Sequence, residues 1–201
     1  MLLIGGSANP NERCTVLLWQ VNVLYVPVGA LQRPFLSRPA SPLGSLEPPS
    51  TVDWGGLGTL CAAAMMRALD AVVRVSSSAT RRRYRSASAC LATLYDSFSD
   101  GSERVERSDQ LSERWAEVAG LRLAFAAWTR QFGAAAGQLE LVFFSAFTTL
   151  WCQHSTPQMA ALDARAKPHA SPRTRVDAAL SQLPAFATSH GCKGGVQCEL
   201  W

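Results

Sequence analysis

The chain has 201 residues, of which 48% are hydrophobic and 17% are charged, and its formal net charge is +4. This composition excludes a disordered chain, which would be poor in hydrophobic residues, and the length is sufficient for one domain with a hydrophobic core. No apolar run reaches the roughly eighteen residues that span a bilayer, and the opening MLLIGG is too short for the core of a signal peptide. We therefore expect neither a membrane segment nor a signal peptide.

The first part of the chain predicts a strand and a loop. Residues 22–35, NVLYVPVGALQRPF, open with β-branched and aromatic residues that Pro27 interrupts, which is typical of a short strand followed by a turn. The Pro- and Ser-rich segment 37–51 predicts a loop. We expect a mostly helical remainder and a single domain over 1–201.

Apolar residues recurring at steps of three and four predict helices after this loop. In the first helix the predicted inward face is Leu57, Leu60, Cys61, Ala64, Met65, Ala68, Leu69 and Val72. A second helix is expected around 84–95, and the stripe of the third is Leu111, Trp115, Val118, Leu121, Phe125 and Trp128. A fourth, over 139–152, is expected to bury Leu139, Val142, Phe143, Phe147, Leu150 and Trp151. The tail, 153–201, is expected to be irregular apart from a short helix near 177–186.

Charged residues give few functional signals of their own. Arg81, Arg82, Arg83 and Arg85 surround Tyr84, while the other arginines are scattered among acids. This favours a solvated helix face or loop over a phosphate-binding patch, and no nucleic-acid partner is expected.

The third predicted helix carries two acids one turn apart, Glu113 and Glu117. Like charges at this spacing cost a few tenths of a kcal/mol unless a cation lies between them, so the pair is either solvated or part of a site. His169 is an exposed loop histidine or a functional one.

Six segments in order resemble the last third of the M13 metallopeptidases, the neprilysin and endothelin-converting-enzyme family. They are LYVPVGALQRPF, WGGLGTLCAAAMMRALD, ERWAEVAGLRLAF, VFFSAFTTLWC, HASPRTRV and LPAFATSHGCKGGVQCELW. The resemblance runs from about residue 22 to residue 201, and its most specific part is the closing Pro-x-Phe, Gly-Cys and Cys-x-x-Trp. It implies a mainly α, zincin (thermolysin-like) C-terminal lobe with a short N-terminal strand, truncated relative to the family.

The resemblance places the family's zinc motif, HExxH, on AAMMR. In that motif two histidines one turn apart bind zinc and the glutamate activates the zinc-bound water. Here Ala63 and Arg67 stand in the histidine positions, and Ala64 stands in the position of the catalytic glutamate.

The remaining family positions are partly kept. ERWAE matches the Glu-x-x-x-Asp pattern, with Glu113 as the third zinc ligand and Glu117 in the position of the orienting Asp, one methylene longer. His169 matches the family's transition-state-stabilising histidine, and Arg175 matches the arginine that holds the substrate backbone. The family's substrate-gripping Asn-Ala-x-Tyr segment has no match.

Zinc, the family's cofactor, is not expected to bind here. Alanine has no donor atom and arginine cannot be deprotonated to become a ligand, so one carboxylate remains for a site that needs three protein ligands. We hypothesise that the Arg67 guanidinium fills part of the metal position and pairs with Glu113 or Glu117. The alternative is that Arg67 extends from the helix edge into solvent.

The six cysteines fit neither a CxxC zinc pattern nor a disulfide-dense scaffold. The resemblance implies a disulfide between Cys90 and Cys198. In the family the counterparts of Cys152 and Cys192 bond to cysteines far upstream, and the partners of Cys14 and Cys61 are open. The family acts at the cell surface or after secretion, which implies an extracellular location.

The sequence therefore predicts a neprilysin-like homologue that has lost its catalytic motif and binds a peptide or a partner. Trp115, Phe143, Phe147 and Trp151 are expected to have fewer partners than in the longer family members, so self-association or marginal stability is expected. Two alternatives are a residual zinc-dependent endopeptidase acting on extracellular peptides and a non-functional, truncated gene copy.

Overall fold

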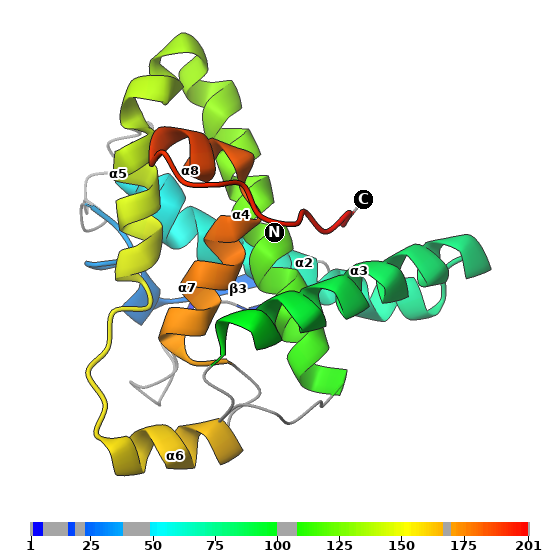
Figure 1. Cartoon of the computed structure of the whole chain (residues 1–201). Helices are drawn as coiled ribbons and strands as arrows, with labels where there is room; N and C mark the ends of the chain where they lie inside the picture. The colour runs from blue at the N-terminus through cyan, green and yellow to red at the C-terminus, as the bar shows by residue number, and fades with distance from the viewer. Residues whose placement is uncertain are drawn as a thin grey trace. The chain divides into compact units, whose positions relative to one another are not determined.

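The computed structural model describes residues 2–5, 16–18, 23–37, 49–99, 108–166 and 170–200 (Figure 1). The strands are β1 (Leu2–Gly5), β2 (Val16–Leu18) and β3 (Val23–Pro27), and short helical turns are η1 (Val28–Ala30), η2 (Trp54–Gly58) and η3 (Gly133–Ala135). The α-helices are α1 (Thr51–Asp53), α2 (Thr59–Arg74), α3 (Ser78–Phe98), α4 (Ser108–Phe132), α5 (Ala136–Thr149), α6 (Pro157–Ala166), α7 (Pro172–Ser181) and α8 (Pro184–Ser189). The expected mainly helical fold is confirmed. Within the described ranges, no helix is long and apolar enough to cross a membrane.

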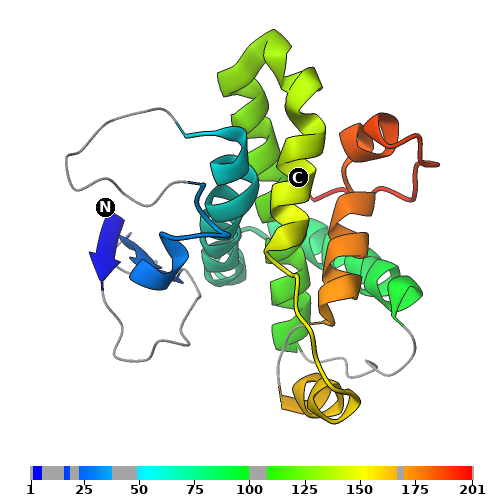
Figure 2. The same ribbon diagram turned by 90° about the vertical axis from the view of Figure 1, so that its left-hand side faces the viewer.

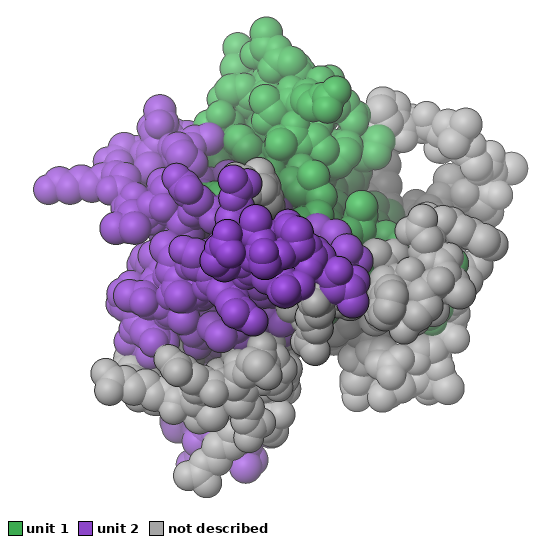
Figure 3. All heavy atoms as spheres, turned by 90° about the vertical axis from the view of Figure 1, so that its right-hand side faces the viewer, with its two compact units in different colours: residues 1–68, 120–150 green, residues 69–119, 151–201 purple. Residues whose placement is uncertain are grey.

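The chain divides into two compact units, coloured separately in Figure 3. Unit 1 comprises residues 1–68 and 120–150, and unit 2 comprises residues 69–119 and 151–201. Helices α2 and α4 each contribute residues to both units. Whether 1–201 behaves as one domain in solution stays a prediction.

Unit 1 contains a three-stranded sheet in the order β1-β3-β2. Strand β3 lies within the predicted strand and ends at Pro27, and it pairs parallel with β1 and antiparallel with β2. Leu2 lies opposite Leu24 in the parallel pair, and Val16 lies opposite Tyr25 in the antiparallel pair. Strands β1 and β2 are not predictable from the sequence, because strands of four and three residues are too short to show alternation and are defined by pairing with β3.

Helix α1 begins at a capping box that also fixes the preceding chain. The Ser50 side chain accepts a hydrogen bond from the Asp53 backbone N–H, and the Asp53 carboxylate accepts from the Ser50 backbone N–H at 2.8 Å. The same carboxylate accepts from the Ser37 backbone N–H at 2.6 Å. One side chain therefore joins both ends of the predicted loop, of which residues 38–48 lie outside the described residues.

Aromatic side chains of α4 and α5 form the core of unit 1. Phe125, Trp128 and Phe143 lie with ring centroids 5.0 to 5.3 Å apart, and Phe144 stacks on Phe125 at 5.5 Å. The Trp128 indole N–H donates to the Thr51 hydroxyl at 3.2 Å, which connects the core to α1. These rings combine area burial with favourable tilted and edge contacts.

The predicted inward face of α5 was partly wrong. Phe143 and Phe147 are buried as expected, but Val142 is 40% exposed and Phe144, which was not assigned to the core, is 1% exposed. Leu139 and Leu150 are half-buried. The run LVFF is apolar on every side of the helix, so periodicity alone does not fix which face packs.

The predicted inward face of α2 was also wrong in its larger residues. Met65, Leu69 and Val72 are 42%, 38% and 49% exposed, whereas Ala63 and Ala64 are buried. The physical reason is a close approach of α4: a Cβ on Gly120 would lie 2.5 Å from the Ala63 backbone N and Cα atoms. Only small residues allow this contact, so the alanine face packs and the larger side chains point elsewhere.

Unit 2 is built on α3, α7 and the C-terminal segment, which follows α8 as a red coil without helix or strand in Figures 1 and 2. A disulfide joins Cys90 to Cys198 across 108 residues. In the chain-entropy account, a disulfide that closes a loop of about this length raises the free energy of the unfolded chain by roughly 4.7 kcal/mol. The buried Gln182 side chain donates to the Val196 carbonyl at 2.7 Å and accepts from the Cys198 N–H at 2.8 Å, which fixes the same segment.

The expectation of an irregular tail with one helix near 177–186 was wrong. The tail contains α6, α7 and α8, and residues 182–183 separate the last two. Ser171 caps α7 through the Thr174 N–H, and Pro172 and Pro184 lie at the first positions of α7 and α8. These residues are local start signals of helices, and they explain why the tail forms two separate helices where one was expected.

The capping box generates a pH-dependent prediction. Burial alone would raise the pKa of Asp53, but hydrogen bonds from Ser37 and Ser50 lower it below its usual value. A carboxylate with a depressed folded pKa stabilises the fold above its unfolded pKa, about 3.9, and this stabilisation is lost as pH falls through the folded value. We expect Asp53→Asn to lower the free energy of unfolding by about 1 kcal/mol at pH 7 and by less at pH 3.

Urea denaturation at the two pH values measures this difference. Glu199→Gln removes an exposed carboxylate and serves as the matched control. An Asp53→Asn effect of equal size at both pH values would contradict the capping role of the ionised side chain.

Candidate functional site

Helix α2 carries the three positions that the family resemblance assigned to the zinc motif. Ala63 and Ala64 are 9% and 2% exposed, and Arg67 is half-buried one turn after Ala63. The helix is regular from Thr59 to Arg74, so residues 63 and 67 are one helical turn apart, the spacing that the motif requires of two ligands. The residues do not fit zinc, however, because a methyl group has no lone pair and a guanidinium has no acceptor.

Glu113 and Glu117 follow each other by one turn on α4 in different surroundings. Glu113 is half-buried, whereas Glu117 is 7% exposed. Glu117 is therefore not part of a solvated pair. Its burial requires compensation of the negative charge.

Two side chains of unit 2 compensate the charge of Glu117. The Arg175 guanidinium, from α7, forms an ion pair with its carboxylate. The Tyr95 hydroxyl, from α3, donates to the same carboxylate at 3.2 Å. Both are charge-assisted contacts of the strong kind, so Glu117 connects α4 to α3 and α7.

Arg175 is held on a second side by an aromatic ring. Its guanidinium carbon lies 3.6 Å from the centroid of the Trp151 ring, and its side chain is 12% exposed. A cation over the face of a desolvated Trp gains up to about 2 kcal/mol. Arg175 is thus fixed between the Glu117 carboxylate and the Trp151 indole. This geometry sets the direction of the guanidinium N–H groups that do not contact Glu117.

A second arginine supports the other side of Tyr95. Arg114 lies over the Tyr95 ring at 5.1 Å and pairs with Asp96 at 3.5 Å. Burial raises the pKa of Tyr95 well above its usual value, and the negative charge of Glu117 raises it further. Tyr95 therefore remains a neutral hydrogen-bond donor at physiological pH.

Sequence reasoning missed Tyr95, Arg114 and Trp151 as members of this cluster. Trp151 was assigned to the core of the fourth helix, and the structure places it just after α5, half-buried against Arg175. Apolar spacing indicates that an aromatic residue is buried but not that it packs on a cation. The cluster depends on contacts between residues distant in sequence.

Two sequence expectations remain open. His169 lies outside the described residues. The proposed pairing of Arg67 with Glu113 or Glu117 stays a prediction, although the ion pair with Arg175 and the hydrogen bond from Tyr95 already occupy much of Glu117. In the part of the chain that the structure describes, no cluster of three or more His, Cys, Asp or Glu side chains is arranged to hold a metal.

The cysteines are divided by environment. The Cys90–Cys198 disulfide that the resemblance implied is present. Cys61, Cys152 and Cys192 are free thiols, and Cys14 lies outside the described residues. Burial raises the pKa of Cys61 to about 11, so this α2 thiol is protonated and a poor ligand or nucleophile at neutral pH.

We expect Glu117→Ala to lower the free energy of unfolding by about 3 to 5 kcal/mol, because it leaves the Arg175 charge buried without a partner. The double variant Glu117→Leu/Arg175→Met removes both charges and is expected to recover much of this loss. Urea denaturation of the two variants measures both effects. A loss below about 1 kcal/mol for Glu117→Ala would indicate that the ion pair behaves like an exposed one.

Thiol labelling tests the environment of Cys61. With a pKa of about 11, roughly one Cys61 thiol in a thousand is ionised at pH 8, and burial also limits access. We expect iodoacetamide to label Cys61 only after unfolding in urea, as measured by peptide mass mapping. The exposed Cys152 and Cys192 are the internal controls, and rapid labelling of Cys61 in the native protein would contradict its burial.

Comparison with known proteins finds relatives among the endothelin-converting enzymes and neprilysins. The chain is 24% identical to the endothelin-converting enzyme homolog of Locusta migratoria and 25% identical to human (Homo sapiens) endothelin-converting enzyme 1, each over 205 residues and 90% of this chain. It is 24% identical to Neprilysin-3 of Drosophila melanogaster over 206 residues. The alignments cover 27%, 26% and 25% of those proteins, so the chain spans about a quarter of their length.

Two solved structures share the fold. The Haemonchus galactose containing glycoprotein complex aligns with a TM-score of 0.73 and 19% identity, over 96% of this chain and 36% of that chain. PepO from Lactobacillus rhamnosis HN001 (DR20) aligns with a TM-score of 0.62 and 17% identity, over 89% of this chain and 28% of that chain. The family model described as peptidase family M13 matches residues 19–199. That match covers most of the chain, which therefore belongs to peptidase family M13, a family of zinc-dependent metallopeptidases.

Proposed function

We propose that this chain is a catalytically inactive, neprilysin-like M13 homologue that binds peptides without cleaving them. The observation that carries the proposal is the presence of Ala63, Ala64 and Arg67 at the motif spacing on the regular helix α2. The chain is a member of a zinc peptidase family whose chemistry these three residues cannot supply.

The missing chemistry is specific. Without the two histidines, zinc has at most the Glu113 carboxylate of the expected ligand set, and a zinc site needs three protein ligands to keep one position open for water. Without a glutamate at position 64, no general base is available there to activate that water. Glu117 does not replace this base, since its carboxylate is committed to Arg175 and Tyr95.

The binding part of the proposal rests on Arg175. Glu117 and Trp151 fix its guanidinium, and a guanidinium has five N–H donors, of which one ion pair uses only part. Donors held in a fixed direction bind a peptide carbonyl with little loss of side-chain entropy. By family resemblance His169 would lie beside the same peptide.

The location proposed for this protein is extracellular. The Cys90–Cys198 disulfide supports an oxidising compartment, because structural disulfides are rare in reducing ones. We also propose that 1–201 acts as one M13-like domain that self-associates. Trp115, Phe143 and Phe147, on which this expectation first rested, are buried, so exposed apolar side chains support it instead: Met65, Leu69 and Val72 on α2.

Zinc content, peptide cleavage and peptide binding of one refolded preparation test the proposal together. We expect no stoichiometric zinc by elemental analysis, no cleavage of a peptide library, and retention of some peptides on the immobilised protein. The positive control is the variant Ala63→His/Ala64→Glu/Arg67→His, which supplies two histidines and a glutamate at the motif spacing. An unfolding curve first establishes that this variant is folded, because Ala63 packs against Gly120, and the folded variant is expected to bind zinc.

Each alternative gives a distinct result. Stoichiometric zinc and cleavage that Glu113→Gln abolishes would overturn the proposal in favour of a residual zinc endopeptidase. A chain that folds but retains no peptide, or one that does not fold alone, would favour a non-functional copy.

A further inference from the structure

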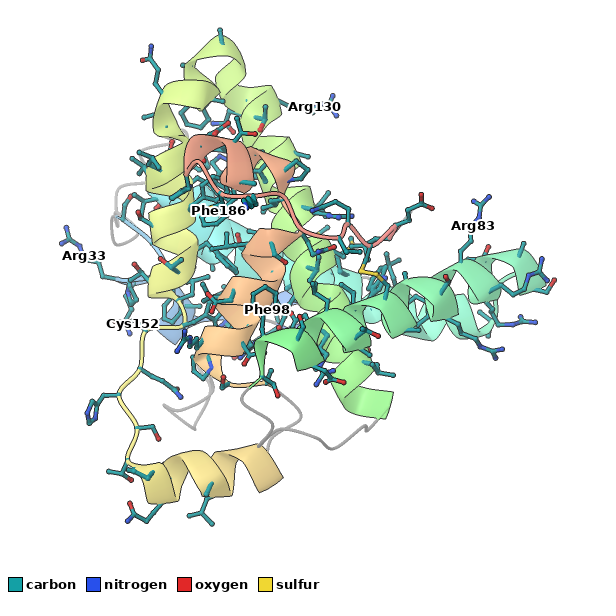
Figure 4. All side chains as sticks on the ribbon, viewed as in Figure 1. Arg33, Arg83, Phe98, Arg130, Cys152 and Phe186 are labelled. Carbon is teal, nitrogen blue, oxygen red and sulfur yellow. A yellow bond between two sulfur atoms is a disulfide. The ribbon has the colours of Figure 1, made fainter. Side chains whose placement is uncertain are left out.

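The first turns of α3 carry an arginine cluster that the proposed function does not use. Arg82, Arg83 and Arg85 are exposed, and Arg81 is half-buried. Figure 4 shows Arg83 pointing away from the helix toward solvent. We call these four residues the α3 arginine cluster.

The positive charge of the whole protein is concentrated in and beside this cluster. Residues 71–95 contain five arginines and no Asp or Glu, although the chain has 19 basic and 15 acidic residues. The rest of the chain therefore holds fourteen basic and fifteen acidic residues and is close to neutral. The formal charge of +4 is a property of one segment rather than of the surface in general.

The cluster is unfavourable for the helix that carries it. Arg81 and Arg85 are like charges at i, i+4, and Arg82 and Arg85 are neighbours at i, i+3, which destabilises a helix by a few tenths of a kcal/mol per pair. The helix N-terminus is also the positive end of the dipole, where acidic residues are preferred, and the first turn of α3 has none. Among the described residues, Arg82, Arg83 and Arg85 form no ion pair.

Packing fixes the direction in which the arginines point. Tyr84, in the middle of the cluster, lies 5.2 Å from the Trp115 ring in unit 2. Ala87, Leu91 and Tyr95 continue the same buried face of α3. The cluster therefore lies on the solvent side of a helix that cannot rotate, and the Cys90 disulfide, five residues after Arg85, fastens that helix to the C-terminal segment.

We propose that the α3 arginine cluster binds a sulfated polysaccharide. Guanidinium groups recognise the oxygens of sulfate and phosphate with paired N–H donors, and short runs rich in arginine are typical of patches that bind nucleic acid or heparin. The disulfide on the same helix indicates an oxidising compartment. Sulfated polysaccharides are the abundant linear polyanions on the outside of cells, whereas nucleic acid and anionic lipid headgroups are mainly inside.

The spacing on the helix suits a repeating polyanion. Cβ atoms three or four residues apart on a helix are about 5 to 6 Å apart, so Arg82 and Arg85 can contact neighbouring sulfates of one chain while Arg83 extends to the side. Binding would neutralise charges that repel each other in the free protein. The affinity is therefore expected to fall steeply with salt, as for other linear polyanions.

Heparin binding of the full chain tests the proposal. The test variant is Arg82→Gln/Arg83→Gln/Arg85→Gln, because the three side chains are exposed and Gln keeps a good helix propensity. The matched control is Arg33→Gln/Arg130→Gln/Lys193→Gln, which removes the same charge from exposed positions on three other segments; Figure 4 labels Arg33 and Arg130. Unfolding curves establish that both variants are folded.

We expect the test variant to bind immobilised heparin at least tenfold more weakly than the unchanged protein at about 0.15 M salt, and the control variant to bind within about twofold. Equal weakening by both variants would overturn the site, since it would indicate net charge only. Tighter binding to a DNA oligonucleotide of equal charge, or to vesicles of anionic lipid, would overturn the sulfated polysaccharide as the partner.

Discussion

Unit 2 depends on the buried carboxylate of Glu117. This one group on α4 accepts from Tyr95 on α3 and pairs with Arg175 on α7, and Arg175 in turn lies on the Trp151 ring. A buried ion pair adds little net stability compared with apolar residues of the same size, but each partner is costly to leave alone. The pair therefore acts less as a source of stability than as a constraint, which keeps three helices in the one arrangement where both charges are satisfied.

This constraint explains why substitutions at catalytic positions and at structural positions have different consequences for the fold. On the proposed assignment, Ala63 and Ala64 stand where the family has a histidine and the catalytic glutamate. This exchange would remove the metal chemistry but leave a good helix, because alanine has the highest helix propensity. The small side chains also suit the contact at which Gly120 approaches Ala63. Loss of Glu117 or Arg175 would instead leave the charge of the other residue without a partner. Folding therefore requires both residues, whether or not the protein binds a substrate.

Sequence patterns predicted the longer elements whose pattern belongs to a single segment, but not α7 and α8 as separate helices, although their start signals are local. The strand β3 and the helices α2 to α5 were recognisable from local periodicity, and the family resemblance implied the Cys90–Cys198 disulfide. Patterns failed where tertiary pairing decides: β1 and β2 depend on β3, and the inward face of α2 depends on the glycine of another helix. The same reason applies to Tyr95 and Trp151, whose roles come from Glu117 and Arg175, distant in sequence.

The arginines of unit 2 show why burial, and not charge alone, distinguishes a structural cation from a binding one. Arg114 is buried and the Arg175 side chain is only 12% exposed, and each has an acidic partner and an aromatic ring, because a desolvated charge must be compensated within the fold. Arg82, Arg83 and Arg85 are hydrated, so folding requires no partner for them and provides none among the described residues. Their repulsion is an avoidable cost to the helix, and a polyanion outside the chain is the kind of partner that would relieve it.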